Sequence, residues 1–128
     1  MNPVLSTPDV RHYSYAVAWS ADDQEYAATV AEFPSLSWLD ADQDAALAGL
    51  RSLVGDVVDD LVANGEPVPA SFGERRFSGE FRLRTTPDMH RWLTIAAARQ
   101  GVSLNRYVNS LLSRGSEARV GLGGWRAA

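Results

Sequence analysis

The stretch that decides the fold reads GEFRLRTTP at residues 79–87 and leads into two helical patterns, over residues 87–100 and 103–114. Side chains of a strand switch faces at every residue, so the apolar residues of the first part share one face and the polar residues share the other. The apolar face holds Phe81, Leu83 and Thr85, and the opposite face holds Glu80, Arg82 and Arg84. The pattern predicts a short strand followed by two helices.

Both helical patterns carry start and stop signals. Thr86 can cap the first helix, and Pro87 suits its first position. Gly101 can take the left-handed conformation that ends a helix, and Ser103 can cap the second one. Apolar residues recur at spacings of three and four in both patterns, which marks one apolar face on each helix. These residues are Met89, Trp92, Leu93, Ala96 and Ala97 in the first helix and Leu104, Tyr107, Val108, Leu111 and Leu112 in the second.

One strand and two helices over residues 79–114 form too small a unit to close a core alone. A single strand also leaves both of its edges unpaired. Two copies solve both problems if they pair strand to strand in a symmetric homodimer with the helices packed behind. The paired strands would then present their polar faces twice, on a ribbon whose width fits the DNA major groove.

At this point the stretch resembles a ribbon-helix-helix DNA-binding module of the Arc and MetJ type. The resemblance implies that outward-facing strand side chains read bases, and these are Glu80, Arg82 and Arg84. It also implies a phosphate clamp at the start of the second helix, where the residues are Ser103, Leu104, Asn105 and Arg106. Free N–H groups and the positive end of the helix dipole favour a phosphate there. The alternative for the two strand arginines is an ordinary solvated face, and Glu80 either accepts from cytosine N4 or pairs with an arginine.

Charge divides the chain into two halves. The net charge is −4, and the 128 residues include no cysteine. Residues 1–78 hold thirteen Asp and Glu against four Arg, which gives −9, whereas residues 79–128 hold three acids against eight Arg, which gives +5. An acidic half beside a basic half indicates two kinds of partner, a positively charged protein and a nucleic acid.

The first half shows the pattern of a sheet followed by one long helix. Alternation predicts the strands and a three-four spacing predicts the helix, which Asp42 caps and Gly65 closes. The helix is expected to cover one face of the sheet. The expected elements are strands over residues 12–20, 25–33 and 36–39, a helix over residues 43–64, and a short fourth strand around residues 75–77. Trp19, Trp38 and Trp92 are expected in a core or an interface, and Trp38 is the candidate among them for an exposed partner contact.

The order of these elements resembles the N-terminal domain of HicB-type antitoxins. The features that carry the resemblance are the early hairpin, the FPSLSW segment at residues 33–38, the helix start at Asp42 and the GEPVP exit at residues 65–69. Ser37 and Trp38 replace the Gly-Cys pair of the family's turn. The resemblance implies an α+β fold, with a partial RNase H-like βββα(β) domain and a C-terminal ribbon-helix-helix (βαα) domain. The expected layout is a toxin-binding domain over 1–70, a linker over 71–78, a DNA-binding domain over 79–114 and a flexible tail over 115–128.

The resemblance further implies an antitoxin of a type II toxin-antitoxin pair. Such a protein binds a HicA-like mRNA-cleaving toxin, represses its own operon and forms a homodimer that pairs further into a tetramer on operator DNA. The alternative is an orphan ribbon-helix-helix regulator whose first domain senses a ligand or mediates assembly. The sequence shows neither a signal peptide nor a long apolar span, so a cytoplasmic protein with no membrane association is expected.

A third alternative is a metal-dependent nuclease. Such an enzyme needs converging carboxylates that hold two cations. Strand residues 12–20 carry no acid, and Asp22 and Asp23 fall in a turn. Asp56, Asp59 and Asp60 share a helix face, where a solvated acidic surface is favoured over a metal cluster. No phosphate loop and no nucleophile beside a histidine is present, so we expect no enzyme activity, no catalytic residue, no metal and no cofactor.

Overall fold

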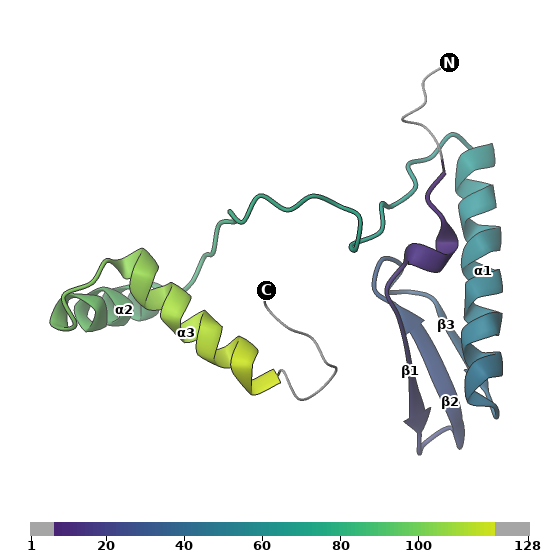
Figure 1. The fold of residues 1–128 in the computed structure, drawn as a ribbon, viewed down its shortest axis with the longest axis horizontal. Coiled ribbons are helices and arrows are strands. Elements are labelled where there is room, and N and C mark those ends of the chain that lie inside the picture. The colour runs from purple at the N-terminus through teal and green to yellow at the C-terminus, as the bar shows by residue number, and fades with distance from the viewer. Residues whose placement is uncertain (1–6, 120–128) are drawn as a thin grey trace. The chain divides into compact units, whose positions relative to one another are not determined.

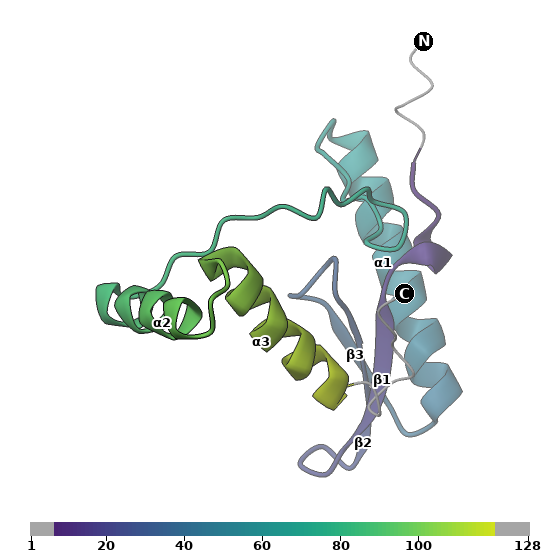
Figure 2. The ribbon, with the colours of Figure 1, turned by 60° about the vertical axis from the view of Figure 1, so that its left-hand side comes forward.

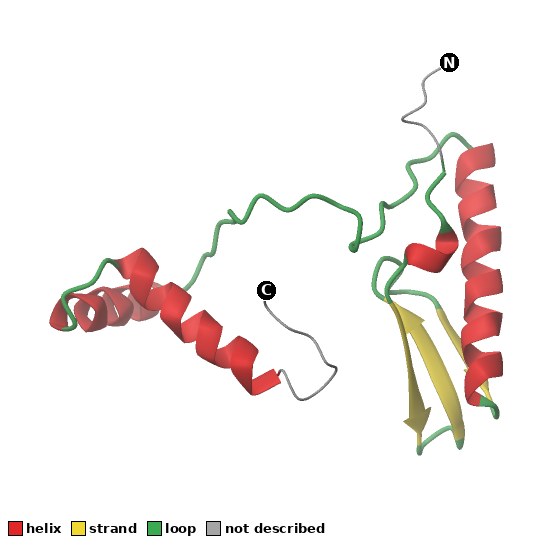
Figure 3. Ribbon diagram, in the orientation of Figure 1, coloured by secondary structure: helices red, strands yellow, loops and turns green. Residues whose placement is uncertain are grey.

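The computed structural model describes residues 7–119 and divides the chain after Ser78 into two compact units. Unit 1 precedes this boundary and unit 2 follows it. Unit 1 contains a short 3-10 helix over Val10–His12, a three-stranded antiparallel sheet and helix α1, and unit 2 contains helices α2 and α3 (Figures 1 and 3). The predicted mixed α+β architecture, a sheet followed by helices, is confirmed.

The sheet has the order β1-β2-β3, with β1 over Tyr15–Ser20, β2 over Glu25–Val30 and β3 over Ser37–Asp40. Tyr15 lies opposite Val30 in the predicted hairpin. The second strand stops three residues earlier than predicted, because the chain turns there and the N–H of Phe33 donates to the carbonyl of Val30 at 3.2 Å. The third strand lies one residue later than predicted.

Helix α1 runs over Gln43–Ala63 and has both of the predicted ends. The Asp42 carboxylate accepts the N–H of Ala45 at 2.8 Å, which satisfies one of the first-turn amides. At the other end, Gly65 has a φ of 68°. The N–H of Glu66 donates to the carbonyl of Leu61 at 2.8 Å, and that of Gly65 donates to Val62 at 3.1 Å. This pair of bonds is the Schellman arrangement that a left-handed glycine permits.

The core of unit 1 lies between α1 and one face of the sheet (Figure 2). Leu50 and Val54 of α1 are fully buried, as is Ala28 of β2. Trp38 of β3 reaches across to α1 at Gly49, where its indole occupies the space that a Cβ would need. The remaining buried apolar residues of this core are Tyr13, Val30, Phe33, Ala46 and Val58.

A buried carboxylate ties three segments of unit 1 together. Glu32 accepts the N–H of Ser14 at 2.8 Å, the hydroxyl of Ser14 at 3.0 Å and the N–H of Phe72 at 2.8 Å. Burial alone raises the pKa of Glu32, but the backbone N–H groups of Phe72 and Ser14 favour the charged form and leave the pKa lowered overall. The segment over residues 71–78, predicted to be a linker, therefore belongs to unit 1 and is hydrogen-bonded to the rest of it through Phe72.

The predicted fourth strand around residues 75–77 is wrong. Among residues 64–86 the structure has no strand, and a local turn takes its place. The Ser71 hydroxyl accepts the N–H of Glu74 and donates to its carboxylate, both at 3.1 Å, and the N–H of Arg75 donates to the Ser71 carbonyl at 2.9 Å. Side-chain hydrogen bonds of this kind compete with strand pairing, and here they prevail.

Unit 2 contains α2 over Pro87–Arg99 and α3 over Leu104–Arg119. Thr86 caps α2, with its hydroxyl accepting the N–H of Met89 at 3.1 Å. Helix α2 ends just before Gly101, the predicted stop signal, whose φ is 69°. Helix α3 continues five residues past the predicted end at Arg114, so the flexible tail predicted from residue 115 is wrong as far as Arg119, and its remainder lies outside the described residues. None of the helices in the described residues has the length and apolar character to cross a membrane.

Candidate nucleic-acid interface

The extended segment over residues 79–86 begins unit 2. It starts at Gly79, whose φ of 86° belongs to the left-handed region that glycine tolerates. The predicted strand is absent from this single chain: residues 79–86 are not in a strand, and the sheet in the described residues consists of β1, β2 and β3. Phe81 is 78% exposed and Leu83 is 62% exposed. A second chain remains the predicted source of the missing strand partner.

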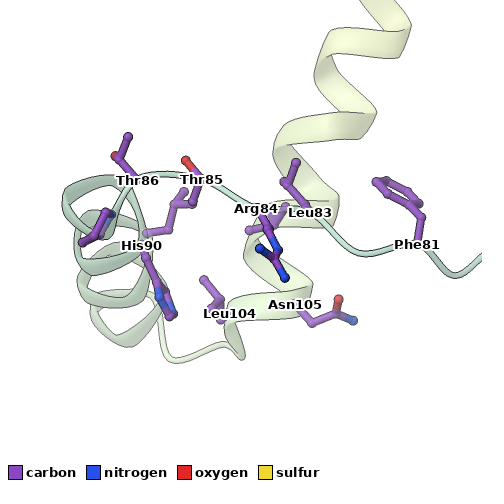
Figure 4. Close-up of a pocket in the computed structure, with 11 residues that line it drawn as sticks. Phe81, Leu83, Arg84, Thr85, Thr86, His90, Leu104 and Asn105 are labelled. Atoms are coloured by element: carbon purple, nitrogen blue, oxygen red, sulfur yellow. The ribbon is translucent and has the colours of Figure 1, made fainter.

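Two grooves lie beside the extended segment within unit 2, and Figure 4 shows the first of them. The first has a volume of about 620 Å³ and the second about 530 Å³. Both are lined by Phe81, Leu83, Asn105 and Val108. The extended segment therefore runs beside α3, and the first turn of that helix reaches the first groove through Leu104 and Asn105. The other residues of the first groove are Arg84, Thr85, Thr86, Pro87, His90 and Leu93, and those of the second are Gly79, Glu80, Asn109 and Leu112.

Unit 2 has little apolar surface buried in the single chain. Of its described apolar residues, Ala97 and Tyr107 are the two that are buried. Large apolar side chains remain exposed on the extended segment and on both helices, and they are Phe81, Leu83, Met89, Trp92, Ile95 and Leu112. A concentration of exposed apolar surface on so small a unit indicates an interface with another chain.

The three predicted base-reading residues lie on the extended segment, but neither groove is lined by all three of them. Arg84 lines the first groove together with Leu83, on the side of Leu104 and Asn105 (Figure 4). Glu80 lines the second groove, and Arg82 lines neither of the two. Strict alternation of faces belongs to a pleated strand, and residues 79–86 are not in a strand in this single chain. All three residues are exposed.

The four predicted phosphate-clamp residues form the start of α3. The Ser103 hydroxyl accepts the N–H of Arg106 at 3.0 Å, and the Ser103 carbonyl accepts that of Tyr107 at 2.9 Å. Ser103 is therefore the predicted cap, and it engages the amide of Arg106. The N–H groups of Leu104 and Asn105 belong to the first turn, which has no carbonyl four residues earlier within the helix.

The first groove also contains polar residues outside the predicted site, among them His90 and Thr85, which line it with Leu104. The available signal for His90 in the sequence was its spacing of three from Leu93. Residues three apart share a helix face, and Leu93 lines the same groove.

The acids considered as a metal cluster do not converge. Asp56, Asp59 and Asp60 are exposed side chains of α1. Throughout residues 7–119, no group of three histidine or acidic side chains has the arrangement of a metal site. The alternative of a metal nuclease therefore receives no support from the geometry of this part of the chain.

A model of the HicB family matches residues 69–112. The match spans about a third of the chain and includes the end of unit 1, the extended segment, α2 and most of α3. It confirms the resemblance to the HicB family over this part of the sequence. No curated protein matches the chain, and no solved structure matches it either.

Proposed function

We propose that this protein is a HicB-type antitoxin that binds a HicA-like mRNA-cleaving toxin through unit 1 and represses its own operon through unit 2. The observation that carries the proposal is the family match over residues 69–112, which coincides with the segment of grooves, exposed apolar residues and arginines. The family consists typically of non-catalytic antitoxins. Unit 2 acts as a homodimer in this proposal, and dimers pair further on the operator.

The case for DNA binding rests on the extended segment. Pairing two copies of residues 80–85 would bury Phe81 and Leu83 and supply the missing strand neighbour at once. The resulting two-stranded ribbon would carry Arg82 twice and fit the major groove, where arginine pairs with guanine O6 and N7. The first turn of α3 lies beside the same segment, so its N–H groups could hold a phosphate while the ribbon reads bases.

The case for a toxin partner rests on charge. Unit 1 carries thirteen acids against four arginines, and such a surface attracts a cationic protein and raises its rate of association. The alternative is an orphan regulator in which unit 1 serves assembly or ligand sensing. One observation favours this alternative: the family match begins at residue 69, so it does not include the sheet of unit 1.

Co-purification from the native host separates the two functions, because the antitoxin is expected to retain a small basic protein. The antitoxin should retain that protein at a fixed stoichiometric ratio and protect messenger RNA from it. An orphan regulator would retain DNA and no such protein.

Operator binding is tested with the substitution Arg82→Ala and with Arg91→Ala on α2 as the matched control. Arg82→Ala should weaken binding to the operator by about 1–3 kcal/mol and relax the preference at one base pair. Arg91→Ala should leave that preference unchanged. Operator affinity should also fall steeply with salt, because bound arginines release counterions from DNA. Equal loss on operator and random DNA would reduce Arg82 to a phosphate contact.

A further inference from the structure

The outer edge of β1 is unpaired in the part of the chain that the structure describes. The sheet has the order β1-β2-β3, and β1 pairs with β2 alone (Figure 1). An unpaired edge presents a row of backbone N–H and C=O groups that another strand can bind. Helix α1 covers one face of the sheet and leaves this edge uncovered.

The register shows which groups point toward this edge. The N–H of Ala31 donates to the carbonyl of Ser14 at 3.0 Å, which makes Ser14 and Ala31 a hydrogen-bonded pair. Such pairs alternate with non-hydrogen-bonded pairs along an antiparallel ladder. Val17 and Trp19 fall in the non-hydrogen-bonded positions, as does Tyr15. Their backbone groups therefore point away from β2, toward the free edge.

This edge lacks the features that normally discourage pairing. Exposed edge strands usually carry a lysine, a proline, a bulge or an inward-pointing charge. The six residues of β1 read YAVAWS and contain no charge and no proline, and the pairing from Tyr15 to Ser20 is continuous and without a bulge. An edge of this kind is suited to binding an added strand, the mode of recognition called β-augmentation.

An exposed tryptophan, packed on a partly buried tyrosine of β2, lies at one end of the same edge. Trp19 is 52% exposed, and its ring packs edge-to-face on Tyr26 with a centroid distance of 5.1 Å. Cross-strand pairing continues from Tyr26 to Asp40, so Trp19, Tyr26 and Asp40 form one row on the helix-covered face. Exposed tryptophan is characteristic of the residues that dominate binding energy in protein interfaces.

The chemistry around this row is acidic. The β1–β2 turn and the start of α1 lie at the same end of unit 1 (Figure 1). Between Tyr13 and Leu50 the sequence has seven acids and neither arginine nor lysine. Arg51 lies toward the opposite end of β1, with its guanidinium 5.8 Å from the centre of the Tyr15 ring. The acids of the turn, of the adjoining ends of β2 and β3 and of the start of α1 are Asp22, Asp23, Glu25, Asp40, Asp42 and Asp44.

We propose that the free edge of β1, with Trp19 at its acidic end, is the surface on which unit 1 binds a β-strand of its basic protein partner. This inference rests on the proposed antitoxin function and identifies the site of toxin contact. The partner residue opposite Trp19 would share its face of the sheet, where an arginine could stack on the indole beside the carboxylates. A second copy of β1 is the disfavoured occupant, because each unit 1 carries a net charge of −9.

The backbone part of the proposal is tested with Val17→Pro, and Val17→Ala is the matched control. Proline removes an N–H that points to the free edge and leaves the bonds between β1 and β2 in place. Alanine removes the side chain and keeps that N–H. With the full-length protein and a small basic protein that co-purifies with it from the native host, Val17→Pro should bind about 100-fold more weakly than Val17→Ala. Far-ultraviolet circular dichroism and operator binding check that Val17→Pro is folded.

The side-chain part is tested with Trp19→Ala, and Trp92→Ala in unit 2 is the matched control, since Trp92 is 55% exposed. Trp19→Ala should weaken toxin binding by about 30-fold, as expected for a central interface residue. Trp92→Ala should leave toxin binding within a factor of about 2, because it changes no residue of unit 1.

The outcomes separate this inference from the function on which it rests. Failure of the wild-type protein to retain a small basic protein from the native host would overturn the antitoxin function itself. Wild-type binding that Val17→Pro and Trp19→Ala both leave unchanged would overturn the β1 site and keep the function. A fall in the number of copies per complex in Val17→Pro, without loss of toxin binding, would identify β1 as a contact between copies and would also overturn the proposal.

Discussion

The two units of this chain differ in how they treat their apolar residues. Unit 1 buries eight residues in one cluster between its sheet and α1. Unit 2 has two helices of 13 and 16 residues, yet Ala97 and Tyr107 are its buried residues in the described part of the chain. A phenylalanine and a leucine, Phe33 and Leu50, are buried in unit 1, whereas Phe81 and Leu83 of unit 2 are largely exposed.

We infer from this difference that the two units are stabilised in different ways. Unit 1 closes its core within one chain, whereas in the proposed function unit 2 completes its core with apolar surface from a second copy. Folding of a unit that depends on association varies with protein concentration, because dissociation favours the unfolded chain. Operator binding should therefore depend on concentration through unit 2, while unit 1 remains folded and available to its partner.

The largest effect is expected from Leu83→Ala, because each dimer carries this residue twice. Removing a buried leucine side chain typically costs 2–5 kcal/mol, so the dimer should lose about 4 kcal/mol or more. Analytical ultracentrifugation should show a monomer at concentrations where the wild type is a dimer. Leu39→Ala in β3 is the control, since Leu39 is 43% exposed and should not change association. A Leu83→Ala protein that dimerises as the wild type does would remove the contrast between the units.

The second effect sharpens the contrast from the side of unit 1. Leu50 of α1 is fully buried in the core of unit 1, with 0% of its surface accessible to solvent. Leu50→Ala should lower the free energy of unfolding of unit 1 by about 3 kcal/mol. Denaturant unfolding should report this loss equally at low and high protein concentration. A loss that varies with concentration would show that the core of unit 1 also depends on another chain.

A third effect concerns the carboxylate that holds the segments of unit 1 together. Glu32→Gln should cost about 2 kcal/mol, because the carboxylate accepts three hydrogen bonds and the amide introduces a donor among donors. The pKa of Glu32 is lowered in the folded state, so its charged form contributes stability above its ordinary value of 4.5. That contribution is lost as pH falls through the lowered pKa. The difference between the two proteins in free energy of unfolding should therefore be constant at neutral pH and shrink in acid.

Much of the fold follows from short-range rules that the sequence displays. Asp42, Thr86 and Ser103 cap the helices they were expected to cap, and Gly65 and Gly101 end the preceding ones. Each of these positions depends on contacts within about five residues, so local chemistry suffices to identify it. The hairpin was equally accessible, because alternation in both strands and the acidic turn agree with each other.

The remaining features depend on partners that the sequence does not place. Phe33 was expected within a strand, but its ring packs on Tyr13 with centroids 5.2 Å apart after the chain has turned. The buried position of Glu32 depends on Ser14 and on Phe72, 40 residues later, and no periodic pattern encodes such a contact. The face of Arg84 depends on whether a second strand holds residues 80–85 in a pleat. Periodicity predicts the alternation, and association must supply the geometry.

The smallest effect is expected from Ser103→Ala, which tests the side-chain cap at the proposed phosphate site of unit 2. The Ser103 hydroxyl accepts the N–H of Arg106 at 3.0 Å, and loss of such a cap costs about 1 kcal/mol of helix stability. Ser113→Ala, an exposed position later in α3, is the control and should change stability by less than about 0.5 kcal/mol. Because the cap orders the first turn, operator binding should weaken together with stability in Ser103→Ala, measured by fluorescence anisotropy and thermal unfolding. Weakened binding with unchanged stability would instead assign the hydroxyl a direct contact with DNA, and unchanged binding with lost stability would separate the start of α3 from the operator.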